Sequence, residues 1–159
     1  MKIRILAIGK IKEKYLKDAI AEYDKRLKNQ LKLEILEGPE EDAPDGLSSG
    51  DIERILKKEG KFFLSKIKDD DYNIALDLHG ELLTSPQIAK VIEEKAMMQG
   101  KNINFLIGGS LGLSGEVKEK CQLKICFGKA TFPHQLIRVF LVEQIYRSIK
   151  IIKNEPYHK

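Results

Sequence analysis

The chain has 159 residues, which is the size of one domain and enough for a substantial core. With 42% hydrophobic and 33% charged residues, and no apolar run near the ~20 residues of a membrane span, the composition indicates a globular protein rather than a membrane or disordered one. The formal net charge of +4 is too small to indicate a class of partner by itself.

The charges are unevenly distributed along the chain. Residues 37–51 hold six acidic residues and no basic one, whereas residues 120–159 hold eight Lys or Arg. A basic C-terminal region favours a polyanion partner, although a solvated helix face followed by a loose tail would give the same pattern. Two cysteines, Cys121 and Cys126, do not form a disulfide framework, so we expect free thiols and a cytoplasmic protein. The N-terminus is interpreted as a first strand, not a signal peptide.

In chain order, short apolar or alternating runs predict strands at residues 3–8, 31–36, 72–78, 103–107 and 123–127. Helical spacing predicts helices over residues 13–27, 51–67, 85–100, 114–120 and 133–152, with Asp51 as an N-cap. The acidic residues 37–50 form a loop, and His79-Gly80-Glu81 is a turn out of the third strand. This order predicts one α/β domain, residues 1–159. Its sheet is mostly parallel, with five to six strands and helices on both faces.

The last predicted helix is apolar on far more than one face. Such a helix must be buried on two sides. One side can face its own sheet, and in a small chain the other favours contact with a second copy of the protein. A fully internal helix is the alternative.

Two glycine-containing loops follow neighbouring apolar strands, Gly108–Gly112 and Gly128–Thr131. Because ligands of open α/β sheets bind at the carboxyl ends of the strands, these loops predict two walls of one small-molecule site. Neither loop fits a dinucleotide or P-loop fingerprint, which disfavours a nucleotide hydrolase or a flavoprotein. The scattered His79, His134 and His158 predict no metal site. An adenosine-type ligand would suit such a pocket, and ordinary structural turns are the competing interpretation.

Several segments resemble the ribosomal RNA large subunit methyltransferase H family, small enzymes of the SPOUT superfamily. The resemblance covers the whole chain and is carried by the segments LD..G at 76–80, IGGSLGL at 107–113, TFPHQLIRV at 131–139, EQIYR at 143–147 and PYHK at 156–159. Two positions depart from the family's usual pattern, Glu81, where Lys is frequent, and Ala130, where a larger residue is common.

The resemblance implies methylation of N3 of a pseudouridine in 23S ribosomal RNA. The methyl donor would be S-adenosylmethionine, no metal would be used, and the substrate would be the assembled ribosome. It also implies a homodimer, formed through the C-terminal helix, and a deep trefoil knot in the C-terminal part of the fold, which is a rare exception to chain topology. By motif match the donor-binding residues would be Leu76, Gly108, Phe127, Gly128, Lys129, Ala130, Thr131 and Phe132.

Methyl transfer to N3 also requires loss of the N3 proton, so a general base or an oxyanion-stabilising donor is expected. Our candidates are Tyr157, His158 and Arg147, with the tail reaching a partner subunit's pocket. The alternatives are a frayed terminus and a surface ion pair between Arg147 and Glu143. The side chains expected to neutralise RNA phosphates are Lys10, Lys12, Arg138, Arg147, Lys150 and Lys153. The competing function is a non-catalytic ribosome-associated RNA-binding protein.

Overall fold

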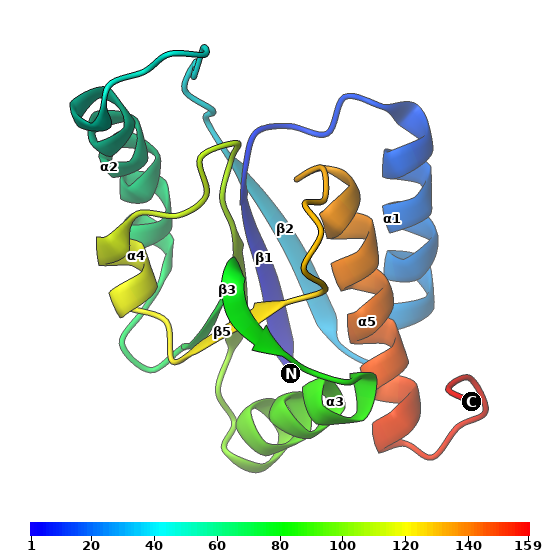
Figure 1. Ribbon diagram of the computed structural model, residues 1–159. Helices are drawn as coiled ribbons and strands as arrows, with labels where there is room; N and C mark the ends of the chain where they lie inside the picture. The colour runs from blue at the N-terminus through cyan, green and yellow to red at the C-terminus, as the bar shows by residue number, and fades with distance from the viewer.

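A five-stranded sheet lies at the centre of the computed structural model, which describes residues 1–159 (Figure 1). Its strands are β1 (Lys2–Ile8), β2 (Lys32–Gly38), β3 (Tyr72–Leu82), β4 (Ile103–Ile107) and β5 (Leu123–Cys126). All four strand pairs are parallel, in the spatial order β2-β1-β4-β3-β5. The predicted α/β class is therefore confirmed, with five strands that all run the same way.

Helices cover both faces of this sheet. One face carries α1 (Lys14–Leu27), α3 (Ser85–Ile92) and α5 (Leu136–Ile152), and the other carries α2 (Ser49–Lys66) and α4 (Gly115–Glu119) (Figure 1). A π-helical segment, Glu93–Met98, continues α3. Successive side chains of β1 point to opposite faces of the sheet, so Ile5 packs with the first set of helices and Leu6 with the second. No helix is long and apolar enough to cross a bilayer.

Two predicted boundaries are wrong. The N-cap of α2 is Ser48, whose hydroxyl accepts from the Asp51 N–H at 3.1 Å, while Asp51 stands at the third helical position and completes a capping box. Residues 79–81 do not turn out of the sheet. Strand β3 continues to Leu82 through a register shift in which Leu76 and Glu81 both pair with Ile125. Gly80 permits this close approach, because a Cβ there would lie 2.5 Å from the Ile125 backbone.

Helix α5 lies between α1 and α3 on the sheet (Figure 1). Together with the sheet, these two helices cover much of the apolar surface of α5. The buried side chains of α5 include Leu141, Val142, Ile145 and Ile149. Phe140 remains 41% exposed. The two-sided burial expected of this helix therefore comes largely from its own chain.

A buried polar cluster ties the amino-terminal ends of three strands together. Arg4 of β1 donates to Asp71 at 2.6 Å and to Asn104 of β4 at 2.7 Å. Asp71 also accepts from Asn104 at 3.0 Å and from Asn102 at 3.1 Å. Burial alone would raise the pKa of Asp71, but these hydrogen bonds, the Lys68 N–H and the Arg4 charge outweigh it and hold the pKa below its usual range.

We expect Asp71→Asn to lower the free energy of unfolding at pH 7 by about 3–5 kcal/mol, because Arg4 would keep a buried charge without its partner. The pKa of Asp71 is lower in the folded protein than in the unfolded chain, where it is about 3.9, so the Asp71 carboxylate stabilises the fold above that pH. This stability is lost as the pH falls through the folded-state pKa. Urea unfolding from pH 7 to pH 2 should therefore show a smaller acid-induced loss in Asp71→Asn than in the wild type. Asp69→Asn, at an exposed position, is the control and should match the wild type within about 0.5 kcal/mol. Parallel pH profiles for Asp71→Asn and the wild type would contradict the assignment.

Candidate active site

A cavity of about 660 Å³ opens at the carboxyl ends of β4 and β5, beside the middle of β3, where the register of β3 shifts. Its walls are residues 76–79, 107–113, 125–128 and 131–134, together with Lys118 of α4 and Ile137 of α5. Both glycine-containing loops named from the sequence contribute to it. A volume of this size is in the range that small-molecule ligands occupy.

Most of the residues expected to bind the donor lie at this cavity. Six of the eight line it: Leu76, Gly108, Phe127, Gly128, Thr131 and Phe132. Lys129 and Ala130 belong to the same loop but are exposed and do not line the cavity. Asp77, His79 and Lys118 line it and were not among the site residues proposed from the sequence. Asp77 follows Leu76 in the motif at 76–80, which was the available signal in the sequence, whereas nothing local marks Lys118.

The loop after β4 depends on two glycines for different reasons. Gly112 has a φ of +82°, a conformation that side chains rarely adopt, and its N–H donates to the Gly109 carbonyl at 3.1 Å. Position 108 requires glycine for lack of space rather than for its φ, because a Cβ there would lie 2.2 Å from the Gly112 carbonyl oxygen. The loop therefore folds back on its own backbone, and three glycines contribute to that wall of the cavity together with Ser110, Leu111 and Leu113.

The acidic loop is attached close to this site. The Glu41 N–H donates to the buried Glu59 of α2 at 3.1 Å, and Lys58 pairs with the Glu41 carboxylate at 3.0 Å. Burial raises the pKa of Glu59, and the neighbouring Glu40 and Glu41 carboxylates add to the effect. Glu40 also lies 3.6 Å from Nε2 of His134, which lines the cavity. The loop thus contacts the cavity wall from outside.

Arg138 was expected to bind RNA, and this expectation is wrong because the side chain is fully buried. Its guanidinium donates to Glu37 at 2.9 Å, to the Ile8 carbonyl at 2.7 Å and to the Gly9 carbonyl at 2.9 Å. Burial lowers the pKa of Arg138, and the Glu37 carboxylate opposes that shift. Arg138 therefore fixes the start of α5, and the cavity wall before it, to the carboxyl ends of β1 and β2.

The three residues proposed for catalysis form one cluster at the other end of α5. Arg147 donates to Glu143 from Nε at 3.0 Å and from Nη2 at 2.6 Å, so the predicted ion pair exists. The Tyr157 hydroxyl donates to the same Glu143 oxygen at 3.1 Å, and the Tyr157 ring lies under Arg147 with its centroid 4.7 Å from the guanidinium carbon. Nδ1 of His158 lies 3.3 Å from Nη1 of Arg147. The tail is thus attached to α5 rather than frayed.

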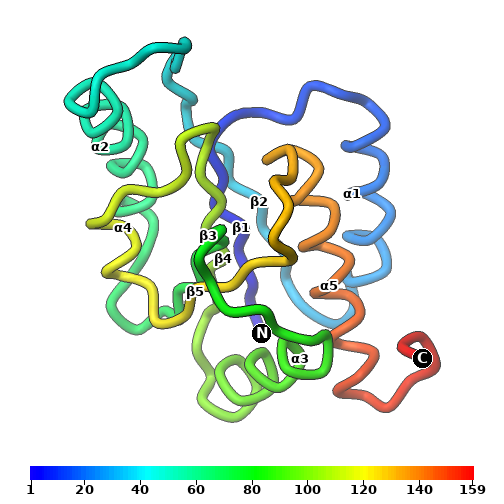
Figure 2. The backbone as a smooth tube through the Cα atoms, viewed as in Figure 1, coloured from blue at the N-terminus to red at the C-terminus, as the bar shows by residue number.

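Neither this cluster nor any other residue after Ile137 lines the cavity of the same chain. Arg147 follows Ile137 by ten positions, which is about 15 Å along a helix. Figure 2 shows the C-terminus beyond the end of α5 that is remote from the cavity loops. One subunit therefore carries both parts of the expected site but does not join them. No three His, Cys, Asp or Glu side chains are grouped in a way that could hold a metal ion.

Comparison with known proteins identifies the family. Residues 1–158 match the family model described as "Predicted SPOUT methyltransferase". The chain belongs to the SPOUT methyltransferase family. Among solved structures, a probable methylase family protein from Haemophilus influenzae Rd KW20 is similar to this chain. It superposes with a TM-score of 0.53 at 15% identity, over 99% of this chain and 70% of that one. At this identity the likeness concerns the fold alone.

Curated relatives within this SPOUT family are much more similar in sequence. "Ribosomal RNA large subunit methyltransferase H 1" of Clostridium perfringens (strain SM101 / Type A) is 55% identical over 100% of both chains. "Ribosomal RNA large subunit methyltransferase H" of Carboxydothermus hydrogenoformans is 51% identical, again over 100% of both chains. The resemblance seen in the sequence motifs is therefore confirmed at the level of the family.

We expect Gly108→Ala to lower the free energy of unfolding of this SPOUT protein by about 1–3 kcal/mol, because the added methyl group meets backbone that cannot rotate away. Gly115→Ala is the matched control, since its Cβ would meet open space at the start of α4. Urea unfolding of the two variants measures the difference. Coincident midpoints would show that the loop is not as tightly closed as described.

Proposed function

We propose that the protein transfers a methyl group from S-adenosylmethionine to N3 of a pseudouridine in 23S ribosomal RNA, on the assembled ribosome in the cytoplasm. The observation that carries this proposal is the similarity of 51–55% identity over the full length of relatives named as ribosomal RNA large subunit methyltransferase H. That length includes the glycine loops and the tail. We also propose a single domain over residues 1–159 and, as the resemblance implies, a trefoil knot, which stays a prediction.

The residues of the cavity fit the donor in chemical character. Ten of the 21 lining residues are hydrophobic, which suits an adenine ring between apolar walls. The glycine loops expose peptide groups that can hydrogen-bond the ring edge without any special side chain. Bound S-adenosylmethionine would supply an activated methyl group on a sulfonium, so that the protein has to bind, align and exclude water.

The tail cluster supports a role in stabilising charge more than a role in removing a proton. Burial, the Tyr23 hydroxyl and the Glu143 carboxylate raise the pKa of Tyr157 well above its ordinary value, which disfavours Tyr157 as a base. A guanidinium can only donate, so Nδ1 of His158 is the acceptor in its contact with Arg147, and in the neutral ring Nε2 carries the proton. We propose that the N3 proton passes to solvent water, and that Arg147 and His158 donate to the uracil carbonyl oxygens, where the resulting negative charge develops.

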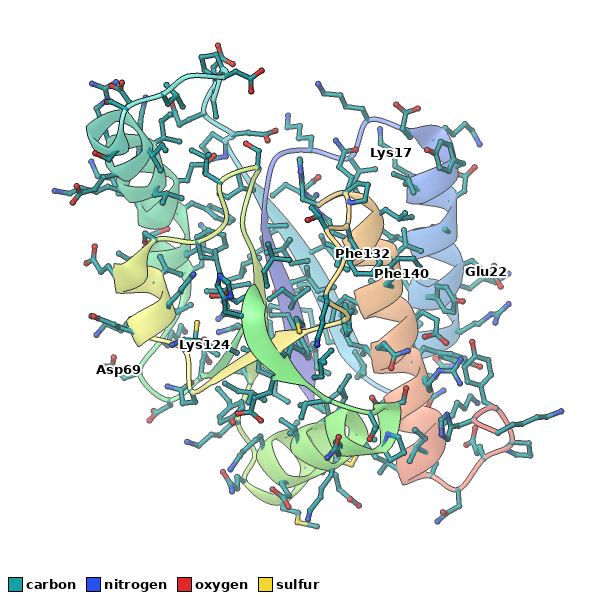
Figure 3. The ribbon with its side chains drawn as sticks, in the orientation of Figure 1. Lys17, Glu22, Asp69, Lys124, Phe132 and Phe140 are labelled. Carbon is teal, nitrogen blue, oxygen red and sulfur yellow. The ribbon has the colours of Figure 1, made fainter.

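A homodimer would bring this cluster to the donor cavity of the partner. Phe140 is exposed on α5 and packs edge-on against Phe132 of the cavity wall, with ring centroids 5.9 Å apart (Figure 3). Leu78, another cavity residue, is 58% exposed. An apolar surface therefore continues from α5 to the cavity, and we propose it as the place where a second copy packs.

Fewer basic side chains remain available for RNA phosphates than the sequence suggested. Arg138 is buried, Arg147 is paired with Glu143, and Lys150 is paired with Glu155. Lys10, Lys12 and Lys153 are exposed, and no ion pair holds their ammonium groups. We propose these three lysines as phosphate contacts, on a ribosomal surface that is recognised largely by shape.

The donor site is tested by calorimetric titration of S-adenosylmethionine into the wild type and Gly108→Arg. We expect binding by the wild type and none by the variant, because a side chain at position 108 has no space beside Gly112. Gly115→Arg, which has open space, should bind like the wild type. Equal heats for the wild type and Gly108→Arg would remove the donor from this cavity.

The reaction itself is tested by methyl incorporation from labelled donor into ribosomes that lack the modification, followed by nucleoside mass spectrometry. A product of N3-methylpseudouridine supports the proposal. Ribosome binding without incorporation would favour the non-catalytic RNA-binding alternative.

The shared site is tested by mixing two inactive variants, Gly108→Arg and His158→Ala, after reversible unfolding. If the tail serves the partner's cavity, a mixed dimer contains one site with an intact cavity and an intact tail, so activity should return to about a quarter of the wild-type rate. His158 is exposed, so its loss should leave the fold intact. Absence of any recovery in dimers shown to be mixed would mean that each site is built from one chain.

A further inference from the structure

The cavity contains one pair of opposite charges among apolar side chains and peptide groups. Asp77 in the middle of β3 and Lys118 of α4 are the only carboxylate and ammonium side chains that line it. Nζ of Lys118 lies 2.6 Å from Oδ2 of Asp77, while Oδ1 accepts from the His79 N–H at 3.0 Å. The Asp77 side chain is 8% exposed and that of Lys118 is 32% exposed.

The pair has hydrogen-bonding capacity beyond the contact between its two members. Burial alone would raise the pKa of Asp77, but the hydrogen bond from Lys118 and the N–H of His79 hold it below its usual range. An ammonium has three N–H donors, and Lys118 uses one of them on Asp77. Each carboxylate oxygen can accept a further hydrogen bond. A ligand can therefore bind both charges without breaking the contact between them.

The pair lies on one side of the cavity only. In Figure 1, β3 lies between α4 and the segment that leads into α5. The wall on the α5 side consists of Phe127, Gly128 and residues 131–134, with no carboxylate or ammonium group. The charged pair is on the α4 side. A ligand that fills the cavity thus meets a mostly apolar wall, with Thr131 and His134 as its polar members, at one end and two opposite charges at the other.

We propose that Asp77 and Lys118 bind the amino-acid end of the methyl donor, with Asp77 accepting from its α-ammonium and Lys118 donating to its α-carboxylate. This inference rests on the proposed use of S-adenosylmethionine. The amino-acid end is a zwitterion, so each of its charges would lie beside a side chain of opposite sign. The two ligand charges and the two side-chain charges would then alternate in sign. Because the two side chains already hold one another in place, little ordering is needed when the ligand binds. The adenosine would then lie against the apolar wall.

An acidic residue in such a cavity can instead bind ribose hydroxyls, and the test must separate the two roles. Calorimetry compares S-adenosylhomocysteine with 5′-methylthioadenosine, which carries the same nucleoside and a thioether but no amino-acid end. We expect the wild type to bind the first compound at least about tenfold more tightly, as two charged hydrogen bonds would give. Asp77→Asn and Lys118→Gln should each weaken S-adenosylhomocysteine about tenfold and 5′-methylthioadenosine less than about twofold.

Glu34→Gln is the matched control. Glu34 of β2 also forms an ion pair, with Oε2 2.8 Å from Nζ of Lys2, but it does not line the cavity. It should change neither affinity. Lys118→Gln, on the partly exposed face of a short helix, keeps the test valid if thermal unfolding shows that Asp77→Asn is poorly folded.

The outcomes separate the inference from the proposed function. If the variants lose equal affinity for both compounds, the pair serves the nucleoside or the shape of the cavity, and the inference is overturned. A wild type that binds both compounds equally well would overturn it too. Both results leave the donor site in place. A wild type that binds neither compound nor S-adenosylmethionine would overturn the proposed function and the inference with it.

Discussion

The attachment of α5 to the sheet through Arg138 is the contact on which the arrangement of the site depends. A fully buried guanidinium is costly unless hydrogen bonds replace its hydration. Here the Glu37 carboxylate and the carbonyls of Ile8 and Gly9 accept from Nη1 and Nη2, while Nε has no partner. Glu37 in turn accepts from the Ile11 N–H at 2.8 Å, which fixes the chain after β1. Three separate segments of the chain therefore meet at one buried charge. Because residues 131–134 precede Arg138 directly, the position of the cavity wall follows from this contact.

The sequence predicted the architecture well because the central strands are buried on both faces and consist of mostly apolar runs, interrupted within β1 by Arg4 and within β4 by Asn104. It failed where long-range contacts decide the conformation. Gly80 was interpreted as a turn residue, but it is required because the backbone of β5 approaches β3 there. Arg138 was interpreted as a surface cation because its acceptors lie about 100 or more positions earlier in the chain. Only the folded chain brings those acceptors to it.

The same reasoning explains what was predictable at the site. Glycine loops after apolar strands are a local signal, and parallel strands bring them to one edge of the sheet. The eight proposed donor-binding positions came from the family resemblance, and six of them line the cavity. Lys118 could not be found in this way, because a lysine on a short exposed helix looks like any solvated residue until Asp77 is seen beside it.

Helix α5 carries one part of the expected site at each end, and its length determines how these parts can be combined. Seventeen residues span about 25 Å, too far for a tail attached beside Tyr146 to reach the cavity at the start of the same helix while it keeps that contact. A twofold axis perpendicular to a helix sets the end of each copy beside the start of the other. Packing two α5 helices in this way would bring Arg147 and His158 of each chain toward the other chain's cavity without moving either from its observed place. The rigidity of the helix, which separates donor and tail within a subunit, would then hold them together between subunits.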